Sequence, residues 1–191
     1  MEGNSESLPP RTTSDIHDRP LAEYEDRLKF PTEEYKGKTV LDIGSGKELK
    51  FARQAAKKGV KVISINPELR SPDIRRNLGH PLKRRVLNKI YHTPQPDERT
   101  VAAVGQDLPI RDNSIDAITA VESVPRYLKE EEDIRNAFTE MIRVLKPGGI
   151  AYVGYGEKAW NERYINATYE SLKKDGHNVT VNETRYYDPR T

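Results

Sequence analysis

The sequence predicts an α/β protein with a doubly wound, mostly parallel sheet of about six strands. Short apolar runs alternate along the chain with segments that repeat their apolar residues at helical spacing. A turn with two glycines, Gly44 and Gly46, directly follows the first of these runs. Because helices that alternate with strands cover both faces of a parallel sheet, these observations together predict the doubly wound arrangement.

The first half of the chain supplies a leading helix and one strand-helix-strand unit. We expect, in chain order, a short helix at 21–30, a strand at 39–43, a helix at 48–59 and a strand at 60–65. Leu21, Tyr24 and Leu28 stand at helical spacing in the first segment. The helix at 48–59 would end at Gly59 and bury one face, formed by Leu49, Ala52, Ala55 and Ala56.

The second half of the chain continues the alternation. We expect strands at 100–104, 114–121 and 150–155, helices at 130–146 and 157–176, and a sixth, edge strand at 178–187 that leaves the C-terminus short. The helix at 130–146 begins with acidic residues, which suit the positive end of a helix dipole. Its apolar stripe consists of Ile134, Phe138, Met141 and Leu145. The Pro-Gly-Gly at 147–149 would end it.

Length and composition indicate one soluble domain. The 191 residues suffice for one well-buried core, and we expect a disordered tail at 1–19 and a single domain at 20–191. The absence of cysteine excludes thiolate metal sites, and the four histidines lack metal-ligand spacing, so we expect no metal. The chain has neither a long apolar run nor an apolar leader, so we expect no membrane span and a cytoplasmic location.

A strongly basic insert follows the second expected strand, at 70–92. Between residues 70 and 89 seven basic residues accompany one acid, although the whole chain has a net charge of only +2. The insert could fold over the mouth of a ligand site, where Arg84 and Arg85 are candidates for binding an anionic substrate. Nucleic acid is the alternative partner of residues 70–89.

The turn after the first strand has the features of a ligand-binding turn. Gly44 and Gly46 let the backbone turn sharply and approach a ligand, and the free amides at a helix start can bind a polar group. Leu49 replaces the third glycine of the dinucleotide fingerprint, which argues against NAD or FAD. Lys47 is followed by Glu48 rather than by serine or threonine, so the turn is not a phosphate loop.

The turn lies in the first of three motifs that follow one another along the chain. They are VLDIGSGK at 40–47, DLPIRDNSIDAITAVES at 107–123 and EMIRVLKPGGIAYV at 140–153. Over about residues 38–156 the chain resembles the class I S-adenosylmethionine-dependent methyltransferases, particularly those acting on small molecules. The resemblance implies a Rossmann-like methyltransferase fold, S-adenosylmethionine as cofactor and methyl transfer to an acceptor, most simply a small molecule.

The resemblance also implies a role for each residue at the strand ends. Asp42 would organise the glycine turn and face the methionine amino group, and Asn66 would bind the ribose hydroxyls. The turn residues against the methionine and ribose would be Gly44, Ser45 and Gly46, and those bordering the adenine would be Gln106, Asp107 and Leu108. Glu122 and Ser123 would lie near the transferable methyl, with Glu122 as the general base if the acceptor must lose a proton.

Two residues depart from the family pattern, which leaves other functions open. Glu48 stands in place of a glycine, and Asn66 stands in place of a carboxylate. An amide lacks charge-assisted bonds to the ribose, at a cost of about 1–2 kcal/mol, so aspartate at this position should bind the cofactor more tightly. The alternatives are a non-catalytic methyltransferase-like protein that binds cofactor or a partner, and a nucleic-acid-binding or modifying protein that uses the basic insert.

Overall fold

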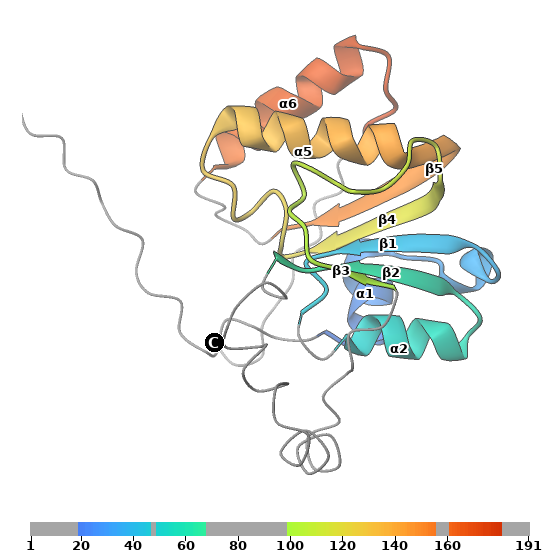
Figure 1. The fold of residues 1–191 in the computed structure, drawn as a ribbon. Coiled ribbons are helices and arrows are strands. Elements are labelled where there is room, and N and C mark those ends of the chain that lie inside the picture. The colour runs from blue at the N-terminus through green and yellow to red at the C-terminus, as the bar shows by residue number, and fades with distance from the viewer. Residues whose placement is uncertain (1–18, 47–48, 68–98, 156–160, 181–191) are drawn as a thin grey trace, which may run out of the picture.

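A computed structural model describes residues 19–46, 49–67, 99–155 and 161–180 (Figure 1). Its strands are β1 Thr39–Ile43, β2 Lys61–Ile65, β3 Thr100–Val101, β4 Ile115–Val121 and β5 Leu145–Gly154. They form one sheet in the order β3-β2-β1-β4-β5, and each neighbouring pair is parallel. The α/β fold with a parallel, doubly wound sheet is thereby confirmed, with five strands in the described residues.

Helices cover both faces of the sheet. They are α1 Leu21–Leu28, the short 3-10 helix η2 Thr32–Tyr35, α2 Lys50–Lys57, α5 Glu131–Val144 and α6 Glu162–Lys174. Figure 1 shows α1 and α2 on one face and α5 and α6 on the other. None of the described helices combines the length and the apolar composition that a membrane crossing requires.

Alternating side chains of the strands build one core on each face. Val40 of β1 packs in the cluster under α1 and α2, whereas Leu41 packs in the cluster under α5 and α6. In the first cluster Tyr24 of α1 stacks on Phe51 of α2, with ring centroids 3.9 Å apart. This stack joins α1 to α2, and α1 also contacts β4 and β5, so its side chains can reach the ends of the strands.

The strand order reverses at β1, and this reversal marks the place for a ligand. From β1 the chain moves outward to β2 and β3, and it then crosses to β4 and β5 on the other side. In doubly wound sheets the ligand crevice lies at the carboxyl ends of the strands beside such a reversal. Ile43 at the end of β1 and Val121 at the end of β4 flank this place.

The second helix buries most of the predicted face: Leu49 and Ala55 are buried and Ala52 packs against the core, but Phe51 is buried where Ala56 was expected. Leu49 precedes α2 in a left-handed conformation, with φ of +51°. Phe51 and Ala55 are buried, whereas Ala56 is exposed. Turning the helix this way buries an aromatic ring, which removes more apolar surface from water than an alanine would.

Strand β3 and helix α5 are shorter than the predicted strand at 100–104 and the predicted helix at 130–146. β3 ends at Val101, whose carbonyl accepts a bond from Asn66 N at 3.1 Å. β3 pairs with β2 only at Thr100 and Val101, and the chain then enters a loop in which Val104 and Asp107 pair with each other. Helix α5 ends at Val144, before the predicted end at residue 146. The Pro-Gly-Gly at 147–149 does not follow the helix directly but lies within β5, where the β4–β5 register shifts.

Several expectations fall outside the described residues. The tail at 1–19 lies there except for its last residue, as do Glu48 and the whole basic insert with Arg84 and Arg85. The sixth strand, expected at 178–187, is described only over 178–180, and these residues are not in a strand.

Candidate functional site

A turn with two left-handed glycines leaves β1 at the reversal of strand order. Gly44 has φ of +81° and Gly46 has φ of +74°, a conformation that residues with a side chain rarely adopt. The amides of Gly44 and Ser45 both donate to the carbonyl of Ile65, at 2.9 and 3.3 Å. The turn is therefore tied to the end of β2 and runs across the predicted crevice.

Gly44 also lets the segment after β4 approach the turn. A Cβ atom at Gly44 would lie 2.2 Å from the Cβ of Ser123, closer than two carbon atoms can come without displacement. Ser123 Oγ donates to the carbonyl of Ile43 at 2.6 Å. The structure thus brings the glycine turn and Ser123 into direct contact.

The hydroxyl of Ser45 indicates a ligand at this turn. The residue is only 4% exposed, and its Oγ has no hydrogen-bond partner among the described residues. Buried hydroxyls in folded proteins nearly always have a partner, because an unsatisfied one costs about 1–3 kcal/mol. A polar group of a bound nucleoside would supply that partner, so the turn fits a nucleoside cofactor.

Asn66 braces the turn from the end of β2. The residue is buried, and its Nδ2 donates to the carbonyl of Gly46 at 2.7 Å. A carboxylate has no N–H and could not make this bond. The asparagine that replaces the family's acid therefore has a structural task of its own, which is to hold the second glycine in place.

Asp42 lies beneath α1 in a buried polar network. Its carboxylate is 0% exposed and accepts bonds from Tyr24 Oη, at 3.1 and 3.2 Å to its two oxygens, and from Thr119 Oγ1 at 3.0 Å. The three residues come from α1, β1 and β4. Asp42 therefore joins the leading helix to the two strands at the reversal, directly before the glycine turn.

Glu122 lies between two arginines at the end of β4. Its side chain is 12% exposed, and its carboxylate forms ion pairs with Arg126 and, at 3.4 Å, with Nη1 of Arg27 from α1. Its backbone is left-handed, with φ of +50°, and its N–H donates to the carbonyl of Gly154 at 2.7 Å. These contacts hold the carboxylate in one place.

The loop after β3 contains the residues expected to border an adenine. Leu108 is buried, Gln106 is partly buried and Asp107 is exposed. Upstream, a Cβ atom at Gly105 would lie 2.8 Å from a methyl group of Val124, so this loop also packs against the segment after β4. The loops after β1, β3 and β4 therefore meet around one edge of the sheet.

Sequence reasoning missed the contribution of α1 to this edge. Tyr24 and Arg27 lie one helical turn apart and reach the carboxylates of Asp42 and Glu122. The sequence predicts Tyr24 only as an apolar position of a helix. Its hydroxyl was the available signal, because a buried tyrosine usually hydrogen-bonds at its polar end.

A parallel sheet with a glycine turn at its reversal of strand order defines a nucleoside- or nucleotide-binding α/β domain. The model of a protein family described as "Methyltransferase domain" matches residues 41–153. The chain belongs to this family, within the class I S-adenosylmethionine-dependent methyltransferases, and the resemblance noted in the sequence is thereby confirmed.

Individual relatives are similar over part of their length. An uncharacterized methyltransferase of Mycobacteroides abscessus is 32% identical over 130 residues, which cover 63% of this chain and 40% of that protein. One from Mycobacterium sp. (strain JLS) is 29% identical over 121 residues, with 62% and 39% covered. The chain thus spans about two-fifths of the length of these curated relatives.

Solved structures with a similar fold include two methyltransferases. A putative S-adenosyl-L-methionine-dependent methyltransferase from Methanococcus maripaludis has a TM-score of 0.45 and 21% identity, with 81% of this chain and 61% of that chain covered. A phosphoethanolamine N-methyltransferase from Haemonchus contortus, in complex with phosphomonomethylethanolamine and S-adenosylhomocysteine, has a TM-score of 0.44 and 17% identity, with 78% and 41% covered.

Proposed function

We propose that the protein binds S-adenosylmethionine at the turn after β1 and transfers its methyl group to a small-molecule acceptor. Membership of the family supports the reaction. The observation that carries the cofactor site is the buried hydroxyl of Ser45, which lacks a partner among the described residues at a turn built for close approach. Bound S-adenosylmethionine supplies a methyl group on a positively charged sulfur, which departs as a neutral thioether when the acceptor's lone pair takes the methyl.

Because the cofactor is already activated, the protein's residues mainly hold and align the reactants. Ser45 Oγ would hydrogen-bond a polar group of the cofactor, and the backbone at Gly44 and Gly46 would let it approach. Asn66 would fix the turn through Gly46, while Asp42 would fix the strand that precedes it. Gln106, Asp107 and Leu108 would border the adenine.

Glu122 is the proposed general base for an acceptor that must lose a proton. Its place after β4, next to Ser123 and the glycine turn, supports this role. Its ion pairs with Arg27 and Arg126 orient the carboxylate. Arg126 is more exposed than Arg27, so an acceptor could displace Arg126 and donate a hydrogen bond to the Glu122 carboxylate oxygen that it leaves.

An anionic acceptor is the finer part of this proposal. It rests on the concentration of basic residues between 70 and 89, of which Arg84 and Arg85 are the candidates for substrate binding. Such side chains would attract a phosphate or carboxylate and orient it at encounter.

Cofactor binding is the first test of the proposed function. In a calorimetric titration we expect S-adenosylmethionine and S-adenosylhomocysteine to bind with a dissociation constant in the micromolar range or weaker, roughly −8 kcal/mol at best. NAD and ATP are the controls, since the turn lacks the third glycine and the phosphate loop that they require. Failure of the folded protein to bind either ligand at millimolar concentration would refute the proposal.

The replacement Asn66→Asp tests how the turn is held. The bond from Asn66 to Gly46 favours the opposite outcome from the family pattern, because the substitution removes the donor to Gly46 O and sets a negative carboxylate against a carbonyl. We expect S-adenosylhomocysteine affinity to fall by about ten-fold, the equivalent of one lost hydrogen bond with an unpaired acceptor. Asn136→Asp, which adds the same charge at an exposed position of α5, is the control. Tighter binding by Asn66→Asp would show instead that a ribose-facing carboxylate outweighs the brace.

A further inference from the structure

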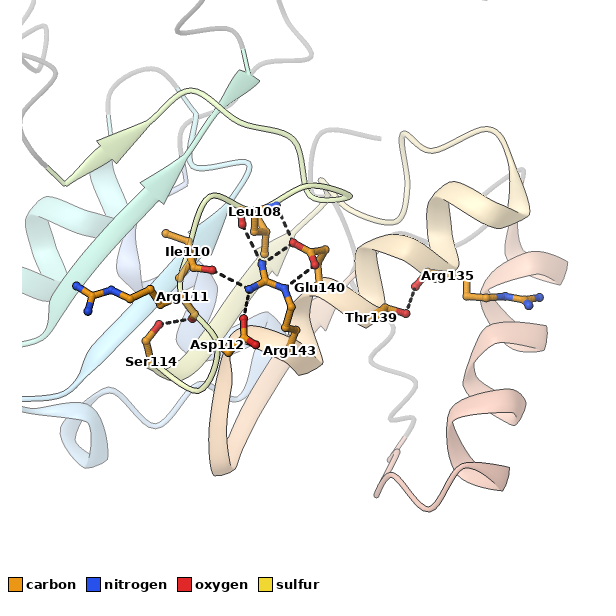
Figure 2. A network of polar contacts seen from close by, with 9 residues as sticks. All are labelled: Leu108, Ile110, Arg111, Asp112, Ser114, Arg135, Thr139, Glu140 and Arg143. Carbon is orange, nitrogen blue, oxygen red and sulfur yellow. Dashed lines mark hydrogen bonds and ion pairs between the residues drawn. The ribbon is translucent and has the colours of Figure 1, made fainter.

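An arginine and a glutamate in the last turns of α5 form a two-point pair beside the loop that joins β3 to β4 (Figure 2). Nε and Nη2 of Arg143 donate to the two carboxylate oxygens of Glu140, each at 2.7 Å. This is the geometry in which an arginine and a carboxylate pair most strongly. Both side chains are partly buried, with Glu140 18% and Arg143 31% exposed, so water screens the pair less than a surface pair.

The remaining groups of the pair bind the loop. Arg143 donates to the carbonyl of Leu108 through Nη2 and to the carbonyl of Ile110 through Nη1, both at 2.9 Å. Its Nη1 also donates to Asp112 at 2.5 Å. Oε2 of Glu140 accepts the N–H of Leu108 at 2.8 Å. Both backbone polar groups of Leu108 therefore bond to the pair, and the guanidinium extends along the loop (Figure 2).

Among the described residues, the loop has few other polar attachments. It runs from residue 102 to residue 114, longer than the usual connection of about 4–6 residues. Within the described residues its only bridge joins Val104 to Asp107, two members of the loop itself. At its far end Asn113 and Ser114 donate to the carbonyls of Arg143 and Val144. Between these points the pair supplies the described polar attachments of the loop to α5.

We propose that Glu140 and Arg143 are positioning residues for cofactor binding, which set the shape of the loop at 106–108 and thereby the affinity for the cofactor. This inference rests on the proposed function, in which that loop borders the adenine. The two side chains act through the backbone of Leu108 and not by touching the ligand. Hydrogen bonds from Arg143 hold the pKa of Glu140 below its usual range, which keeps the pair charged at neutral pH.

The replacement Arg143→Lys separates charge from geometry. Lysine keeps the positive charge, but an ammonium group cannot bind a carboxylate and two carbonyls with one planar fork. We expect the affinity for S-adenosylhomocysteine, measured by calorimetry, to fall by about ten-fold, equivalent to one lost charge-assisted hydrogen bond. Hydrogen exchange at the Leu108 amide should become faster, while amides in β1 and β4 keep their protection.

The matched control is Arg135→Lys on the same helix. Arg135 pairs with Glu131 at 3.1 Å on the exposed side of α5. In Figure 2 its side chain points away from the loop, and no dashed line joins the two. We expect this variant to bind S-adenosylhomocysteine like the wild type. A second variant, Glu140→Gln, keeps the size of the side chain and, like Arg143→Lys, should lower the affinity for S-adenosylhomocysteine.

The outcomes distinguish this inference from the proposed function. If the wild type does not bind S-adenosylhomocysteine, the proposed function is wrong, whereas faster exchange at Leu108 in Arg143→Lys would still show that the pair holds the loop. If the wild type binds and Arg143→Lys binds equally well with both variants folded, the positioning role is wrong. An equal loss of affinity in Arg135→Lys would also overturn it, because a general effect on α5 would then explain the result.

Discussion

Replacing Gly44 by alanine is expected to abolish cofactor binding and to lower the free energy of unfolding by about 2–5 kcal/mol. Two costs add. An L-residue at φ of +81° loses about 1–2 kcal/mol, and a methyl group placed 2.2 Å from Ser123 Cβ forces the segment after β4 away, at about 1–3 kcal/mol. Because that segment and the turn together form the proposed cofactor site, the displacement should remove S-adenosylhomocysteine binding as well. Chemical denaturation and calorimetry measure the two effects.

Gly37→Ala is the matched control for this experiment. Gly37 has nearly the same φ, +80°, but a Cβ there would meet nothing within 4 Å. It should therefore show the conformational cost alone, about 1–2 kcal/mol, with normal cofactor affinity. Equal effects of the two substitutions would show that the approach of Ser123 does not constrain the turn. Partial recovery of Gly44→Ala stability by Ser123→Gly would locate the clash at that pair.

The sheet and its glycine turn could be predicted because their signals are local. Strands such as 39–43 and 60–65 are short apolar runs, and the helix between them shows helical spacing. Gly44 and Gly46, separated by a single residue, indicate a sharp turn. Parallel strands with alternating helices then leave few possible topologies, so the doubly wound sheet followed from the order of the elements.

The polar contacts around the site could not be predicted because they join residues far apart in the chain. Arg27 and Glu122 are 95 positions apart, and Leu108 and Glu140 are 32 apart. Helical spacing shows that a residue faces inward, but not which strand lies opposite. For the same reason the task of Asn66 stayed hidden, since its bond to Gly46 depends on the register of β2 beside β1.

The short third strand shows a different limit of sequence reasoning. Residues 100–104 have the composition of a strand, yet only Thr100 and Val101 pair with the neighbouring strand β2. The length of an edge strand is therefore decided by its partner, and a propensity count of the strand itself does not contain that information.

Replacing Asp42 by alanine is expected to cost about 3–5 kcal/mol of the free energy of unfolding. The substitution leaves the hydroxyls of Tyr24 and Thr119 without their shared acceptor inside the protein, at about 1–3 kcal/mol for each, and adds a small cavity. Asp42→Asn keeps the size of the side chain and one acceptor oxygen, so it should cost less than half as much free energy of unfolding. Denaturant unfolding with an unchanged m-value would assign the loss to the folded state.

Tyr24→Phe should reproduce part of this loss, and Tyr35→Phe is its control. Both tyrosines are buried in the same aromatic core, but Tyr24 donates to a carboxylate, whereas the hydroxyl of Tyr35 meets that of Tyr152 at 3.2 Å. Bonds to a charged acceptor contribute about 1.5–3 kcal/mol, and neutral ones about 0.5–1.5 kcal/mol. We therefore expect Tyr24→Phe to be the more destabilising variant. It should also lower the affinity for S-adenosylhomocysteine, because Asp42 directly precedes the glycine turn. If the two variants are equally stable and bind equally well, α1 packs on the sheet without supporting the site.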